Sequence, residues 1–150
     1  CTTDTLLGSS GLCTAECIYN NITVCIHNDL CCPTGCVFAG DNDCPPNSTL
    51  FASGNFSTVQ QITTGGIEIY YYEDNTYKVK FNSLFSISNT QLDPNLKVYL
   101  ATAQTVSTKA QLDAGNYYLE PLQELSGEQE YDVPQSITSL QDYNSVVIFH

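Results

Sequence analysis

The eight cysteines are the residues best suited to chemistry, and all of them lie within the first 44 of 150 residues. Such a cluster either forms disulfides in an oxidising compartment or coordinates zinc. Zinc sites favour cysteine pairs two residues apart, whereas three residues separate Cys13 from Cys17 and Cys32 from Cys36. We therefore expect a disulfide framework. Its members are Cys1, Cys13, Cys17, Cys25, Cys31, Cys32, Cys36 and Cys44. The pairing stays open among about a hundred connectivities, but the adjacent Cys31 and Cys32 should bond to different partners.

Few other side chains offer acid–base or metal chemistry. His27 and His150 are the two histidines, and among sixteen acids a carboxylate pair is too common to indicate a glycosidase. Asp41, Asn42 and Asp43 place three oxygen-bearing side chains in a row, the donor type that calcium prefers. They lack the glycine and further ligands of an EF-hand loop, so a solvated turn is the alternative. We expect no catalytic residue, no cofactor and no enzyme activity.

Two further patterns concern surface chemistry. Residues 70–72 are three consecutive tyrosines, and strand alternation would place Tyr70 and Tyr72 on the face opposite Tyr71, either as a carbohydrate platform or as cross-strand packing. Three asparagines begin glycosylation acceptor sequences, with unmodified loop asparagines as the alternative. They are Asn21, Asn47 and Asn55.

Composition and charge exclude several classes of protein. The chain has four lysines, no arginine and a formal charge of −12, which repels phosphate backbones and argues against nucleic-acid partners. No apolar run approaches the roughly 18 residues of a membrane span. The chain starts with Cys1 and contains no methionine. We therefore expect that a leader was removed upstream and that Cys1 forms a disulfide, with lipidation of Cys1 as the alternative.

The composition changes at Pro45-Pro46, which predicts two domains. Residues 1–46 should form a disulfide-rich module that is too short to bury an adequate core. Residues 47–150 contain no cysteine and should fold by apolar burial. The proline pair fixes two φ angles and predicts a stiff connection.

The sequence pattern of the second domain predicts antiparallel β structure. Residues 66–72 and 77–82 alternate with period two around a turn at 73–76, with Tyr77, Val79 and Phe81 on the buried face. Short segments separated by turn residues predict an antiparallel β-sandwich or barrel. Further strands are expected at 50–56, 84–88, 97–102, 117–120, 129–133 and 145–149, and one short helix at Ser107–Ala114.

The second domain resembles the DM-thirteen domain, a small β-sandwich often found beside DOMON domains in secreted and cell-surface proteins. The resemblance rests on residues 95–100, 127–134 and 143–149 in their order and spacing, together with 54–56 and 65–69. It covers roughly Leu50 to His150.

The resemblance implies a redox accessory role, because a cysteine after the last of these segments has been suggested as a redox residue in that family. This chain has His150 there. The family also continues into one more strand, so we expect the sandwich of this chain to lack an edge strand, which a neighbouring molecule could supply. The segments 31–36 and 41–44 resemble cysteine-rich parts of predicted archaeal surface proteins.

Together these observations favour a secreted or cell-surface structural or adhesive protein. It would assemble with itself, as a homo-oligomer or filament, or with other surface proteins. The contact surface would include the apolar strand Val146, Val147, Ile148 and Phe149. The alternatives are the redox accessory module and a carbohydrate-binding module.

Overall fold

The computed structural model describes residues 2–7, 16–88, 93–137 and 139–150. The chain divides into two compact units, Cys1–Asn47 and Ser48–His150. They are called unit 1 and unit 2 below, and each is described by itself.

Unit 1 combines a hairpin with a disulfide-linked segment. Strands β1 (Thr2–Leu7) and β2 (Glu16–Asn21) pair antiparallel, with Thr2 opposite Asn21. These two strands are additional to those expected from the sequence. The segment 22–47 contains no helix or strand, and so its conformation depends on turns and cross-links.

Two disulfides cross-link this segment. They join Cys25 to Cys36 and Cys32 to Cys44. Cys31 is also disulfide-bonded, and since Cys32 is bonded to Cys44, the adjacent cysteines are not bonded to each other. Of the other predicted framework members, Cys1, Cys13 and the side chain of Cys17 lie outside what the structure describes.

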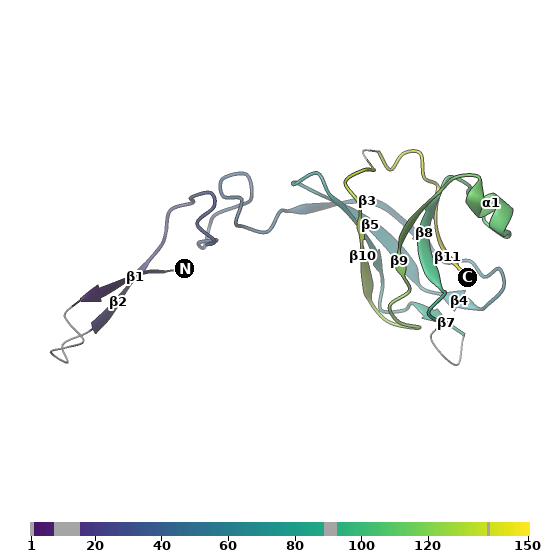
Figure 1. Ribbon diagram of the computed structural model, residues 1–150, viewed down its shortest axis with the longest axis horizontal. Helices are drawn as coiled ribbons and strands as arrows, with labels where there is room; N and C mark the ends of the chain where they lie inside the picture. Colours follow the sequence, from purple (N-terminus) through teal and green to yellow (C-terminus); the bar gives the residue numbers. More distant parts are fainter. Residues whose placement is uncertain (1, 8–15, 89–92, 138) are drawn as a thin grey trace. The chain divides into compact units, whose positions relative to one another are not determined.

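Unit 2 is an antiparallel sandwich, as predicted, and its two sheets face each other in Figure 1. The first sheet has the order β10-β6-β5-β3 and the second β11-β8-β9. The first consists of β10 (Gln129–Val133), β6 (Tyr77–Phe81), β5 (Gly66–Tyr72) and β3 (Ser48–Asn55). The second consists of β11 (Ser145–Phe149), β8 (Lys97–Ala101) and β9 (Asn116–Pro121). A short pair, β4 (Thr63–Thr64) with β7 (Ser86–Ile87), and helix α1 (Lys109–Asp113) complete the unit.

The core lies between the two sheets. Its centre is aromatic, because the Phe81 ring lies 5.1 Å from Tyr131, 4.8 Å from Phe85 and 4.9 Å from Phe56 between centroids. Val98 and Leu100 of the second sheet belong to the same core and are almost completely buried. Ring pairs at these distances add to the stabilisation from apolar burial.

Most element predictions agree with the structure. Val79 and Phe81 are buried, whereas Lys78 and Lys80 on the alternate positions are partly exposed. The helix is shorter than predicted and begins after Thr108, not Ser107. The Thr108 hydroxyl accepts from the Gln111 amide, and the Gln111 side chain accepts from the Thr108 amide. This reciprocal pair satisfies two helix-end donors and explains the shift.

One buried hydroxyl fixes the loop before β10. Tyr131 is fully buried, donates from its hydroxyl to Gln129 Oε1 at 2.6 Å, and accepts from the Gln123 amide at 3.2 Å. Gln129 holds the same loop through both the amide and the carbonyl of Glu124. Burial raises the pKa of Tyr131 to about 12, so the hydroxyl stays a neutral donor.

We therefore expect Tyr131→Phe to lower the free energy of unfolding by about 1–3 kcal/mol, because it leaves buried partners unpaired. Chemical denaturation followed by circular dichroism measures this change. The control is Tyr118→Phe, since Tyr118 is 42% exposed and its substitution should change stability little. Equal stabilities of the two variants would contradict the role assigned to the hydroxyl.

Candidate functional site

The sandwich of unit 2 is closed on one side and open on the other. On the closed side β9 and β10 lie close together, and the Gln123 side chain donates to the Glu130 carbonyl at 2.9 Å. On the opposite side the sheets end in β3 and β11. Each of these edge strands pairs with only one neighbour in the described chain, so a row of backbone groups on each faces away from its sheet.

A groove of about 560 Å³ lies on this open side. Ile67, Ile69 and Leu100 contribute apolar surface, together with Val146 and Ile148 of β11. The remaining lining residues include uncharged polar side chains and further apolar ones, and none is aspartate, glutamate or lysine. In a chain with sixteen acids, an acid-free groove of this size is a candidate binding site.

The strands that border the groove lack two of the usual protections of sheet edges, charged side chains and proline. Edge strands are commonly guarded by charged side chains, proline or bulges. Neither Ser48–Asn55 nor Ser145–Phe149 contains a charged residue or a proline. A bulge leaves Phe51 without a register partner in β3, and the remainder of both strands is regular.

The four predicted assembly residues divide between the two faces of β11. Val146 and Ile148 pack against the main core, while Val147 and Phe149 pack against a smaller cluster beside α1, formed by Ala101, Val106 and Leu112. These side chains are therefore partly buried within unit 2. The backbone edge of β11, more than an apolar face, is what remains available to a partner.

His150 lines the groove. Its Nε2 atom lies 3.1 Å from Asp93 Oδ2. The pKa of Asp93 is lowered, chiefly by the hydrogen bond that its carboxylate accepts from the Asn95 amide and further by His150. The second histidine, His27, accepts from the Asn42 amide through Nδ1 in unit 1.

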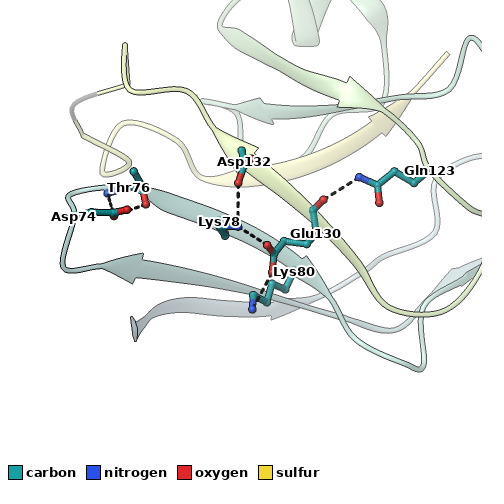
Figure 2. Close-up of polar contacts among 7 residues, drawn as sticks. All are labelled: Asp74, Thr76, Lys78, Lys80, Gln123, Glu130 and Asp132. Carbon is teal, nitrogen blue, oxygen red and sulfur yellow. Dashed lines mark hydrogen bonds and ion pairs between the residues drawn. The ribbon is translucent and has the colours of Figure 1, made fainter. Parts of the chain in front are cut away.

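The outer face of the first sheet carries a charge ladder. Figure 2 shows the Glu130 carboxylate in contact with both Lys78 and Lys80, and Asp132 in contact with Lys78. The carboxylate of Asp132 lies 3.3 Å from the Lys78 ammonium. Glu130 lies 2.9 Å from Lys80. The hydrogen bond from Lys78 is the main cause of the lowered pKa of Glu130, and Lys80 contributes further.

The same lysines cover the tyrosines considered as a carbohydrate platform. Lys80 lies 5.2 Å from the centroid of the Tyr70 ring, and Lys78 lies 5.8 Å from that of Tyr72. The Tyr70 hydroxyl donates to Glu68 at 2.7 Å, which is the main cause of its raised pKa. Both rings are thus engaged in packing within the sheet.

The remaining predicted sites lie at the surface or in unit 1. Asn21, Asn47 and Asn55 are exposed. Asn42 uses its side-chain amide in two hydrogen bonds with Asn28. Asp41 and Asp43 lie instead beside Asp29, a residue that sequence reasoning missed.

Comparison with known proteins gives one result for unit 2. Residues 55–150 match the family described as Electron transfer DM13, and the chain belongs to this family. The match covers the sandwich and agrees with the resemblance to the DM-thirteen domain. Searches of curated proteins and of solved structures found no match.

The residues of the matched span do not fit a cysteine-based redox centre. All eight cysteines precede Ser48, and the chain contains no methionine or tryptophan. At the position where the resembled family has a cysteine, His150 stands beside Asp93. The chain therefore has no thiol at this position that could take part in redox chemistry.

The charge ladder predicts a specific pH dependence. Because the folded-state pKa of Glu130 lies below its ordinary value, its contribution to stability is present above about pH 4.3 and is lost as the pH falls through the lowered pKa. Glu130 is partly exposed, so the contribution is at most about 1 kcal/mol. We expect Glu130→Gln to lower the melting temperature at pH 7 and to differ from wild type progressively less as the pH falls from about 4.3 toward pH 3.

The exposed neighbour Glu128 provides a control of equal charge change, and Glu128→Gln should match wild type at both pH values. A difference in melting temperature between wild type and Glu130→Gln that stays constant with pH would be evidence against a stabilising role for the charge ladder.

Proposed function

We propose that the protein is a non-enzymatic, extracellular structural or adhesive protein that assembles by strand addition on the open side of unit 2. The observation that carries this proposal is the pair of uncharged edge strands, β3 and β11, on either side of an acid-free groove. An extended segment in such a groove forms main-chain hydrogen bonds with an edge while its alternate side chains fill apolar positions.

We further propose that the occupant is an uncharged strand of a second copy of this chain. Two molecules with a charge of −12 repel each other over most of their surface. The groove and its two border strands are regions where that repulsion is locally absent, since they carry no carboxylate. The edge strands themselves have the composition that such a groove accepts, which permits repeated contacts between identical subunits.

The disulfides of unit 1 support an extracellular location, because such bonds persist in oxidising compartments. In the described part of the chain, no helix is long and apolar enough to cross a membrane. Glycosylation at Asn21, Asn47 or Asn55 belongs to the same proposal, as all three asparagines are exposed.

An electron-transfer accessory role is the second candidate, and the family description favours it. With no thiol in unit 2, this role requires a chromophore bound to the protein. A visible absorption spectrum of the purified, untreated protein decides between the candidates. We expect no band above the tyrosine region, and a stoichiometric chromophore would favour electron transfer.

Strand addition is tested by placing a charge on each face of β3. Ala52 pairs with Ile69, which packs against the core, whereas Ser53 pairs with Glu68 on the outer face. Residues directly opposite each other share a face, so Ala52→Lys puts its charge toward the groove and Ser53→Lys puts the same charge opposite Glu68.

We expect wild type and Ser53→Lys to associate with increasing concentration in analytical ultracentrifugation, and Ala52→Lys to associate at least about tenfold more weakly, because an inward-pointing charge disfavours edge pairing. Thermal unfolding checks that both variants fold. Monomeric wild type at high concentration, or equal association of the two variants, would refute the proposal.

A further inference from the structure

Three carboxylates converge in unit 1. One oxygen each of Asp29, Asp41 and Asp43 lies within 4.8 Å of the other two. Like charges at this separation repel each other and raise the energy of the fold unless a positive charge lies among them.

Backbone amides hold the three side chains in place. Asp43 Oδ2 accepts from the amides of Asp29 and Leu30 at 2.8 and 3.1 Å. Asp29 Oδ1 accepts from the Cys31 amide at 3.0 Å, and Asp41 Oδ1 accepts from the Asp43 amide at 3.1 Å. These bonds engage one oxygen of each carboxylate, and the described contacts leave the second oxygen of each for another ligand.

The buried carboxylate of Asp41 is an independent observation. Asp41 is 0% exposed, and its Oδ2 atom has no hydrogen-bond partner among the described residues. A buried oxygen without a partner costs free energy, and a buried charge costs far more. Residues 1–47 contain no lysine and no arginine, so no side chain with a permanent positive charge in this unit can offset it.

We infer that Asp29, Asp41 and Asp43 bind one calcium ion. Calcium takes six to eight oxygen ligands in flexible geometry, and water or backbone carbonyls would complete its shell. Zinc prefers nitrogen and sulfur ligands, but His27 Nδ1 accepts from the Asn42 amide and the nearby Cys32 and Cys44 are bonded to each other. The site therefore offers carboxylate oxygens to a hard cation.

The ion would join the two ends of the disulfide-linked segment. Asp29 lies near its start, and Asp41 and Asp43 lie near its end, just before Cys44. Because the segment has no helix or strand to stabilise it, calcium binding should add directly to the stability of unit 1.

Isothermal titration of the EDTA-treated full chain with calcium chloride, in buffer containing sodium chloride to screen weak surface binding, tests the inference. We expect one calcium ion per chain, and affinity at least about tenfold lower for Asp41→Asn, which keeps the size of the side chain and removes its charge. The control is Asp142→Asn, because Asp142 is exposed in unit 2, and its affinity should equal that of wild type.

A second variant separates loss of the ion from loss of the fold. Asp29→Asn retains an oxygen for the Cys31 amide, so it should keep the disulfides and still bind calcium at least about tenfold more weakly. Intact mass with and without reductant counts the disulfides. Absence of calcium binding by wild type, or equal affinity in wild type, Asp29→Asn and Asp41→Asn, would overturn the inference.

Discussion

The sandwich depends on the buried hydrogen-bond network around Tyr131. The hydroxyl links Gln129 to the backbone at Gln123, and Gln129 in turn holds Glu124. Through these bonds the loop after β9 is attached to β10, which closes one side of the sandwich. On the other side the sheets end in β3 and β11, and no described hydrogen bond joins these two strands. The groove lies on this side.

The two units hold the chain in a fixed conformation by different means. Unit 2 buries an aromatic and aliphatic core from both sheets. Unit 1 has a long segment without helices or strands, in which disulfides and side-chain bonds to backbone amides fix the turns. The acidic side chains of the two units also differ in their surroundings. In unit 2 Glu130 bridges two lysines on a solvated face, whereas in unit 1 Asp41 is buried without any lysine or arginine in the unit.

Local patterns predicted unit 2 well and unit 1 poorly, for a physical reason. Strands such as β6 and β10 alternate in burial, so period two reveals both their extent and their buried face. The hairpin of β1 and β2 lies among cysteines, whose spacing carries no comparable signal. Asp29 is twelve positions before Asp41, and hydrogen bonds between the two turns, such as that from the Asp29 amide to Asp43, bring it close. Sequence adjacency selected Asn42 instead, although its amide is used by Asn28.

Membership of the Electron transfer DM13 family establishes the relationship of the sandwich but not what this chain does with it, because activity belongs to particular residues of a fold. The matched span lacks the thiol on which a cysteine-based redox role would depend. What it has is a sandwich closed on one side, with uncharged edge strands on the other. Had those edges only to remain soluble, a lysine or a glutamate pointing from β3 toward the groove would protect them at little cost. The absence of charged residues across the whole of Ser48–Asn55 is more readily explained if the edge serves as a contact surface, which favours assembly over electron transfer.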